Sequence, residues 1–219
     1  MNSRRITVGV DEAGRGSLVG DMFVVGIGVV DEYSRLLVES GVRDSKTLSK
    51  SRRRRLLLDI LAYSDIIVVC RVKPEEIDRE NINNLEVEAL KKILKHIKFR
   101  GRQPSKILVD EIAGRKKAIE SVVENLFPGV EVLMKPNADR DFVQVSAASI
   151  VAKCLRDELI GILSSTYGDI GSGYPSDPRT IDWLKSIEER GSIPNCVRKS
   201  WKTLRRVCAK TLDAYIEKK

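Results

Sequence analysis

Short runs of apolar, often β-branched residues recur along the first two thirds of the chain and predict five strands. These runs cover residues 5–10, 22–30, 66–72, 106–110 and 130–134. Between and after them, apolar residues spaced three or four positions apart predict helices. The predicted helices cover residues 49–62, 85–97, 115–126, 142–163, 180–190 and 200–216, and a further short helix opens at Pro74.

The elements come as strands first, then strands alternating with helices, and finally helices alone. This order predicts an α/β sheet core followed by a helical appendage. A stretch at 167–178 that carries glycine and proline separates the two parts. We therefore expect a core domain over residues 1–170 and a C-terminal helical subdomain, packed on it, over 171–219. Residues 31–33 are expected to turn the chain back between antiparallel strands.

The net charge is +8, from 39 Lys and Arg against 31 Asp and Glu. An excess of this size favours a polyanionic partner, nucleic acid first. No apolar run approaches the ~18 residues of a membrane span. An acidic pair at positions 11–12 also arrives too early for a signal peptide. We expect a cytoplasmic protein without a membrane partner.

The four cysteines form no CxxC pair, and the chain has a single histidine, His96. A zinc knuckle and a His-dependent catalytic triad are therefore disfavoured. Hydrolytic chemistry in this chain must use carboxylates, a metal ion, or a hydroxyl or thiol with a lysine.

Four acids stand at or just beyond the ends of predicted strands: Asp11, Glu12, Asp110 and Asp139. Sites of open α/β sheets lie at the carboxyl ends of strands, so these side chains are able to converge. Oxygen ligands without His or Cys select Mg²⁺ or Mn²⁺. Two such ions would suit in-line displacement at a phosphodiester. Alternatively, each acid alone is a turn residue or a helix cap.

Six blocks in a fixed order carry a resemblance to a known family. They are DEAGRG at 11–16, RDSKTL at 43–48, LVD at 108–110, AD followed by SAASIVAK over 138–153, GSGYPSDP at 171–178 and VRKSWKT at 197–203. Together they resemble type 2 ribonucleases H, the ribonuclease HII family, over roughly residues 5–205. The order and spacing of six blocks are a far more specific signal than any one of them.

The resemblance implies a ribonuclease H-like fold, a mixed five-stranded sheet flanked by helices, with a helical C-terminal appendage. Residues 1–170 would be the catalytic domain and 171–219 a substrate-binding subdomain. It also implies hydrolysis of RNA paired with DNA and incision 5′ of ribonucleotides embedded in duplex DNA. The products would carry 5′-phosphate and 3′-hydroxyl ends, and the cellular roles would be ribonucleotide excision repair and primer removal.

The resemblance assigns the metal site to the four acids named above. Asp11 would bridge both ions, Glu12 and Asp110 would complete the coordination, and Asp139 would hold the ion that activates water. One departure is Asn137, which stands where the family often has a lysine. Glu111 and Asp141 are neighbouring acids that compete for the same roles.

The resemblance also implies residues that bind substrate. Main-chain groups of Gly14, Arg15 and Gly16 would contact the ribose 2′-hydroxyl, the group that distinguishes RNA from DNA. Tyr174 would bond the same oxygen and stack on the following sugar. Alternatively, Arg15 is a phosphate clamp and Tyr174 packs under its own loop.

Phosphate contacts are assigned to Lys46, Ser146, Ser149 and Lys153, of which the last three share one helical face. Alternatively, residues 146–149 form a small-residue face for close helix packing. Asn81 lies in a segment that resembles a family segment near the phosphate path, and this match is weaker than the others.

The sequence leaves two alternative functions open. One is a noncatalytic module that binds hybrids or duplexes, against which the four acids argue. The other is a different ribonuclease H-like nuclease, such as a resolvase or an exonuclease, against which the residues assigned to the 2′-hydroxyl argue. The expected partners are RNA/DNA hybrids and duplex DNA containing ribonucleotides, bound by a monomer. No sliding-clamp motif is clear at 212–216, so a clamp partner is unproven.

Overall fold

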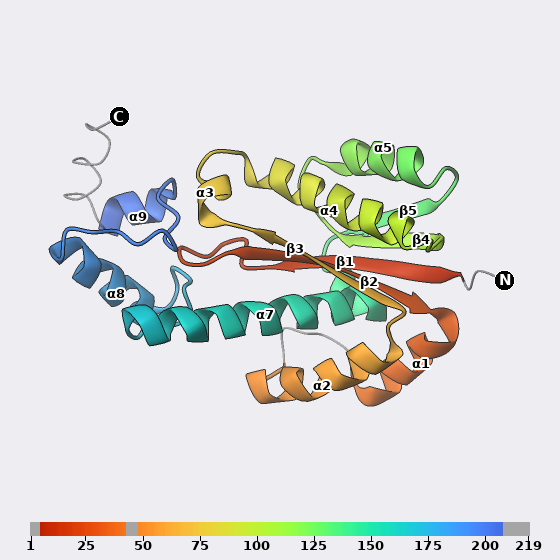
Figure 1. Ribbon diagram of the computed structural model, residues 1–219, viewed down its shortest axis with the longest axis horizontal. Helices are drawn as coiled ribbons and strands as arrows, with labels where there is room; N and C mark the ends of the chain where they lie inside the picture. Colours follow the sequence, from red (N-terminus) through yellow and green to blue (C-terminus); the bar gives the residue numbers. More distant parts are fainter. Residues whose placement is uncertain (1–4, 43–47, 208–219) are drawn as a thin grey trace.

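The structure, a computed structural model, describes residues 5–42 and 48–207. Its centre is a five-stranded sheet in the order β3-β2-β1-β4-β5 (Figure 1). The strands are β1 (Ile6–Ala13), β2 (Met22–Val30), β3 (Ile66–Val72), β4 (Pro104–Asp110) and β5 (Glu131–Lys135). β1 pairs antiparallel with β2 and parallel with β4, whereas β2–β3 is antiparallel and β4–β5 parallel. The expectation of a mixed five-stranded sheet flanked by helices is confirmed.

Helices cover both faces of the sheet. α4 (Ile82–Phe99) and α5 (Lys116–Leu126) lie on one face, and α1 (Asp31–Ser40), α2 (Lys50–Tyr63) and α7 (Val143–Tyr167) lie on the other (Figure 1). Each layer has its own apolar cluster, one centred on α4 and the other on α7 and α2. β1 lies between the two layers, which buries almost the whole strand.

Close packing of α7 on β1 depends on a glycine. A Cβ added to Gly9 would fall 2.3 Å from the carbonyl carbon of Gln144, so only glycine permits this approach. The α7 face that follows is made of small buried residues, among them Ala147 and Ala148. The first turns of α7 therefore lie against the strand that leads into Asp11.

The C-terminal helices pack beside the connection between β1 and β2. They are α8 (Pro178–Glu189) and α9 (Lys202–Val207). An apolar cluster joins Leu18 and Val19 of that connection to Trp183, Leu184 and Leu204. Val19 also forms an isolated antiparallel bridge with Val197. The division into domains at 170/171 stays a prediction.

Several boundaries differ from the sequence expectations. The residues expected to turn at 31–33 instead open α1, whose first turn carries two acids that favour a helix N-terminus. Asn81 caps α4 by accepting a hydrogen bond from the amide of Asn83, so the helix starts three residues earlier than expected. Of the terminal helix expected over 200–216, the described part is α9, and the rest lies outside the described residues. The remaining short helices are α3 (Pro74–Ile77) and α6 (Ala138–Asp141).

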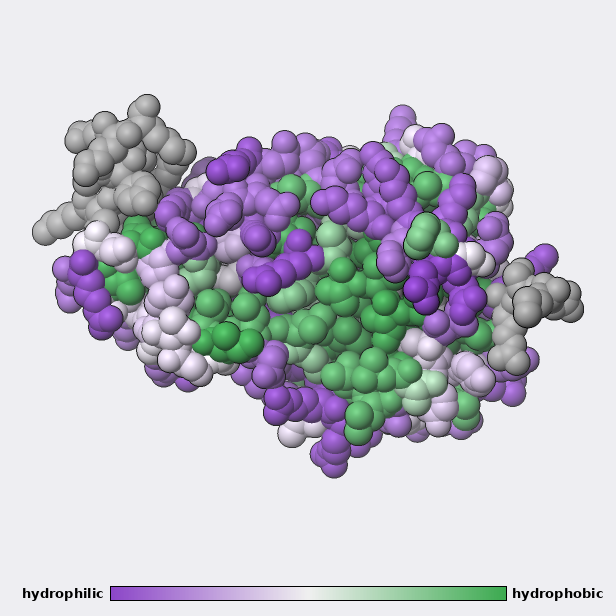
Figure 2. Space-filling model, in the orientation of Figure 1, coloured by the Kyte–Doolittle hydropathy of each residue, from purple (hydrophilic) through white to green (hydrophobic). Residues whose placement is uncertain are grey.

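The surface in this view is polar at its rim and apolar near its middle. Figure 2 shows hydrophobic side chains gathered over edge strand β3 and part of α2. The exposed apolar residues on these elements include Leu58, Leu61 and Val69. Among the described residues, no helix is both long enough and apolar enough to cross a bilayer.

Candidate active site

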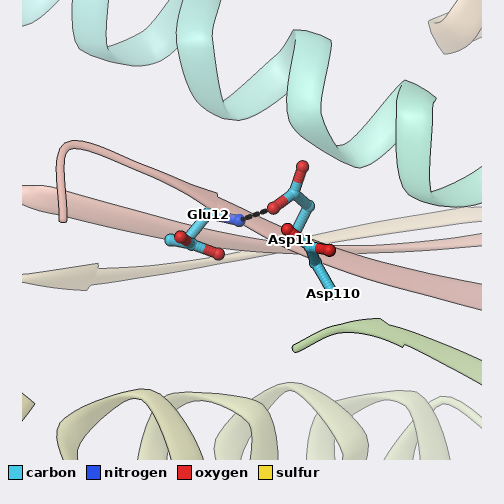
Figure 3. A group of neighbouring side chains, drawn as sticks. All are labelled: Asp11, Glu12 and Asp110. Atoms are coloured by element: carbon cyan, nitrogen blue, oxygen red, sulfur yellow. Dashed lines mark hydrogen bonds between the residues drawn. The ribbon is translucent and has the colours of Figure 1, made fainter. Parts of the chain in front are cut away.

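Three acids from two neighbouring strands meet at one edge of the sheet. Asp11 and Glu12 lie at the end of β1, and Asp110 ends the parallel strand β4. Each offers a carboxylate oxygen, and these atoms all lie within 4.8 Å of one another (Figure 3). Parallel neighbours end at the same edge, which is why residues 99 positions apart converge here. We call these three residues the acidic cluster.

Asp11 is the most enclosed member of the acidic cluster, with 6% of its surface exposed. Its Oδ1 accepts a hydrogen bond of 2.7 Å from the amide of Glu12 (Figure 3). The hydroxyl of Ser149 on α7 also bonds the carboxylate, and Lys153 Nζ donates to Ser149 Oγ at 2.9 Å. Burial, and next the charge of Glu12, raises the pKa of Asp11 well above its ordinary value.

The electrostatics of the acidic cluster favour a bound cation. Burial raises the pKa of Glu12, and the negative charges of Glu86 and Asp110 add to the effect. Like charges brought together out of water resist ionisation unless a positive charge compensates them. The cluster offers oxygen donors alone, which suits Mg²⁺ or Mn²⁺. The donor set therefore fits a hard divalent ion.

Asp139 is connected to the acidic cluster through the backbone, but it lies outside the group of acids whose carboxylate oxygens come within 4.8 Å of one another. The amide of Ala138 donates to Asp110 Oδ1 at 2.9 Å, which places the start of α6 against the end of β4. Asp139 is the next residue and is 2% exposed. Asn137, which precedes α6, adopts a φ of 54°. Asparagine tolerates this left-handed region better than a lysine would, so the departure from the family pattern has a conformational reason.

The two competing acids lie apart from the cluster. Glu111 is exposed and follows Asp110, the last residue of β4. Asp141 is also exposed and forms an ion pair with Lys135. Neither belongs to the acid group that the described residues bring together.

The glycine turn, residues 14–16, follows β1 and the acidic cluster. Gly14 has a φ of 90°, and a Cβ there would lie 2.7 Å from the carbonyl oxygen of Asp21. The fold itself therefore requires glycine at position 14. Gly16 is exposed, and an added Cβ would meet no atom of the described residues within 4 Å. Neither packing nor a positive φ accounts for glycine at position 16.

Arg15 is held inside the protein at both its side chain and its main chain. Its Nη1 forms an ion pair with Glu86, and its Nη2 donates to Asn83 Oδ1. Its carbonyl oxygen accepts a bond of 2.8 Å from Nη1 of Arg198, which is fully buried. Burial lowers the pKa of Arg198 to about 9. The alternative of a phosphate clamp loses support, because both terminal nitrogens of Arg15 have internal partners.

Tyr174 rests on a buried arginine. The guanidinium carbon of Arg156 lies 4.5 Å from the centre of the ring, and Arg156 Nη2 donates to the carbonyl of Ser172 at 2.7 Å. Asp177 holds the same loop by accepting from the amide of Ser172 at 2.7 Å, a bond that lowers the pKa of Asp177 to about 2. The ring is half-buried rather than enclosed, and its contact with a sugar stays a prediction.

The residues assigned to phosphate contacts differ in how far they are exposed. Ser146 and Ser149 are each 1% exposed on the α7 face that packs on the sheet, which agrees with the small-residue alternative. Lys153, one turn further, is half-buried and bonded to Ser149. Lys46 lies outside the described residues. Asn81 is an exposed helix cap, and Asn83 makes the contact with Arg15 instead.

Sequence reasoning assigned no role to Glu86, Arg156 or Arg198. A signal for Glu86 was present, since it precedes Leu90 by four residues and Ile93 by seven. An acid on the apolar stripe of a helix is expected to be buried and partnered. Arg198 lies within the block at 197–203, and Arg156 lies three residues after the block that ends at 153. The residues that these two arginines contact lie in other segments of the chain.

The comparisons with known proteins agree with one another. The family model described as Ribonuclease HII matches residues 8–204. Ribonuclease HII of Sulfurisphaera tokodaii is 44% identical over 204 residues, which cover 92% of this chain and 95% of that protein. The crystal structure of ribonuclease H2 from Pyrococcus horikoshii OT3 has a TM-score of 0.82 and 35% identity, covering 94% of this chain and 98% of the other.

A second solved structure contains a partner. It is the complex of PCNA with RNase HII from Archaeoglobus fulgidus, whose matching chain has a TM-score of 0.79 and 35% identity. The match covers 90% of this chain and 95% of that one. Taken with the acidic cluster, these similarities establish that the chain belongs to the ribonuclease HII family, a divalent-metal-dependent family, and is an endoribonuclease with ribonuclease H activity on RNA/DNA hybrids.

Proposed function

We propose that this enzyme incises duplex DNA on the 5′ side of an embedded ribonucleotide, in addition to hydrolysing the RNA strand of hybrids. The products carry a 5′-phosphate and a 3′-hydroxyl. This activity would serve ribonucleotide excision repair and primer removal. The observation that carries the proposal is the position of Gly16, which lies four residues after Glu12 and has open space, among the described residues, where a side chain would be.

Open space at Gly16 suits close approach of a substrate to the main chain. Gly14 is explained by its own backbone, whereas no contact within the described residues explains Gly16, and close approach of a substrate is the reason that we propose. A main chain without side-chain obstruction is able to bond a ribose 2′-hydroxyl, which deoxyribose lacks. The turn is held at Arg15 from two sides, and this rigidity supports discrimination between the two sugars.

In the proposed site, Asp11, Glu12, Asp110 and Asp139 would hold two divalent ions, Mg²⁺ or Mn²⁺. When bound, such ions polarise the scissile phosphate and stabilise the charge that develops on its oxygens. The chain supplies the remaining positioning. Ser149 orients the Asp11 carboxylate, and the amide of Ala138 orients Asp110.

The substrate strand would follow the rest of the described site. Tyr174, supported by Arg156, would bond the 2′-oxygen and stack on the deoxyribose that follows. Lys153 on α7, which bonds to Ser149, would contact the phosphates, and Lys46 is assigned to them from the sequence alone. The C-terminal subdomain, over 171–219, would grip the duplex.

The test uses end-labelled duplex DNA with one ribonucleotide, incubated with Mg²⁺, Mn²⁺ or chelator, and the cut is mapped. Metal-dependent incision on the 5′ side of the ribonucleotide is the expected result. Cleavage of long hybrids without incision at the single ribonucleotide would contradict the proposed activity on duplex DNA. Tight binding without incision would favour a degenerate binding module.

We also infer a monomer in the cytoplasm as the working state of the enzyme. A sliding clamp is a candidate partner, because the A. fulgidus RNase HII forms a complex with PCNA. Gel filtration of the full chain alone tests the monomer, and gel filtration after mixing with PCNA tests the clamp partner. An unchanged elution volume in the mixture would contradict the clamp partner.

A further inference from the structure

We propose that Glu86 is a positioning residue whose buried carboxylate holds the Arg15 side chain and thereby fixes the glycine turn beside the acidic cluster. The inference rests on the proposed function in one respect, since it assumes that this turn reads ribose. The contacts that carry it are independent of that assumption.

Glu86 and Arg15 form an ion pair between α4 and the end of β1. The Glu86 side chain is 1% exposed, and that of Arg15 is 33% exposed. Oε2 of Glu86 accepts from Arg15 Nη1, while Arg15 Nη2 donates to Asn83 Oδ1. Both terminal nitrogens of Arg15 are therefore directed into the protein. The part of the turn left to meet a substrate is its main chain.

Asn83 extends this contact to the second catalytic strand. Its Nδ2 donates to the carbonyl oxygen of Ala113 at 3.1 Å, three residues beyond Asp110. The first turns of α4 thus connect the segment that follows Asp11 and Glu12 to the loop that follows Asp110. Glu86 and Asn83 together set the position of one segment relative to the other.

Stability alone does not explain an acid at this position. A buried ion pair is often no more stabilising than a well-packed apolar pair. Oε1 of Glu86 is buried and accepts no hydrogen bond from the part of the chain that the structure describes. Burial raises the pKa of Glu86, and Asp11 and Asp110 add to this, whereas Arg15 opposes it. A costly charge kept beside other acids is expected where geometry matters to function.

The pair also adjusts the charge around the acidic cluster. After burial, Glu86 has the largest effect in raising the pKa of Glu12, and Arg15 lowers it. While both partners are present, Arg15 offsets part of the charge that Glu86 places near the cluster. Removing Glu86 alone leaves the Arg15 cation near the metal site without its partner. Glu86→Gln should therefore weaken cation binding, and further removal of the Arg15 charge should reverse part of that loss.

The experiment is a double-mutant cycle in the full chain with Glu86→Gln, Arg15→Met and the double variant. Steady-state kcat and KM are measured on duplex DNA with one ribonucleotide, and Mn²⁺ binding is measured by calorimetry without substrate. Each single variant should lower kcat/KM about tenfold, and the double should be no worse than the poorer single. Glu86→Gln should weaken Mn²⁺ binding about threefold, and the double variant should recover part of that affinity because it also lacks the Arg15 cation.

The control is Glu88→Gln, which makes the same charge change on the same helix. Glu88 is exposed and paired only at the surface with Lys91, so this variant should behave as the parent in both measurements. If Glu86→Gln fails to fold, Asn83→Ala takes its place, because it removes the second partner of Arg15 from a partly exposed position. It should lower kcat/KM about threefold.

Losses that multiply in the double variant would show that Glu86 acts independently of Arg15 and would overturn the inference. The inference would also be overturned if Glu86→Gln had the same kcat/KM as the parent. Where Asn83→Ala replaces that variant, an unchanged kcat/KM of Asn83→Ala would overturn it. A parent enzyme that fails to incise the duplex contradicts the proposed function instead. The Mn²⁺ cycle then still tests the pair, because it needs no substrate.

Discussion

Arg198 donates from Nη1 to the carbonyl oxygen of Arg15 at 2.8 Å, although 183 positions separate the two residues. The same guanidinium donates from Nε and Nη2 to the carbonyl of Gly20 at 3.0 and 2.9 Å. A side chain from the C-terminal segment therefore holds both ends of the connection that contains the glycine turn. The C-terminal segment contributes to the site as well as to the fold.

We expect Arg198→Met to destabilise the protein and to impair incision. The substitution leaves two buried carbonyl oxygens without their donor, at a cost of about 2–4 kcal/mol. The melting temperature should fall by roughly 5–15 °C. At 25 °C, kcat/KM should fall further than the folded fraction accounts for. Lys202→Met removes the same charge from an exposed position, and a similar loss of stability in that variant would contradict the explanation.

The two glycines of the turn should separate stability from activity. Gly14→Ala introduces a Cβ at a positive φ and against Asp21, so we expect a loss of at least about 1 kcal/mol in the free energy of unfolding. Gly16→Ala adds a methyl group in open space and should leave the melting temperature nearly unchanged. Its kcat/KM for a single embedded ribonucleotide should nevertheless fall about tenfold or more. Full activity of Gly16→Ala would remove this residue from the proposed substrate contacts.

Asp11→Asn should abolish cleavage and stabilise the metal-free protein at pH 7.5. The pKa of Asp11 is raised in the folded state, so its contribution to stability declines as pH rises from its unfolded pKa of about 4. Asparagine still accepts the amide of Glu12 but carries no charge. Scanning calorimetry in chelator should show a higher melting temperature for the variant, by several degrees if about 1–2 kcal/mol is recovered.

The same pKa shift predicts a difference between pH 5 and pH 7.5. The decline in stability over this interval should be smaller in Asp11→Asn than in the parent. Saturating Mg²⁺ should stabilise the parent more than the variant at pH 7.5. A metal-free variant less stable than the parent at pH 7.5 contradicts this account of the cluster.

Asp139→Asn should abolish cleavage and spare binding of the duplex. The substitution keeps the shape of a side chain that is 2% exposed, while it removes a carboxylate from the proposed metal site. Gel-shift affinity in Ca²⁺ should stay within about threefold of the parent, because phosphate contacts dominate affinity for nucleic acid. Full cleavage by this variant would exclude Asp139 from the metal site.

Tyr174→Ala should mainly affect cleavage at single ribonucleotides. Loss of a stacking contact of about 1–2 kcal/mol lowers kcat/KM about tenfold. Arg156 packs against the Tyr174 ring and bonds the carbonyl oxygen of Ser172 in the same loop. Arg156→Gln should therefore cause part of the same loss in kcat/KM, because the ring and its loop lose this support. Tyr167→Ala, at the far end of α7, serves as the control. An active Tyr174→Ala variant would leave the tyrosine as a packing residue.

Local pattern in the sequence was enough to predict the strands and the positions of the acids on them. The β2 and β3 boundaries match the apolar runs at 22–30 and 66–72, because short continuous runs of apolar, β-branched residues are typical of buried strands. The ends of the apolar runs also placed Asp11 and Asp110 at strand ends. Residues 31–33 were misjudged as a turn, since the acids that open α1 carry a helix signal that three residues do not reveal.

The tertiary structure decided which of these residues act together. Asp11 and Asp110 converge because β1 and β4 are parallel neighbours, a pairing that depends on the topology of the whole sheet. The apolar stripe of α4 indicates that Glu86 is buried, but only the folded chain supplies its partner, Arg15. Arg198 belonged to a recognised block, yet its hydrogen bond to Arg15 requires the last helices to fold back on the first strand. Sequence patterns record what each segment prefers locally, whereas contacts between distant segments arise only when the chain closes on itself.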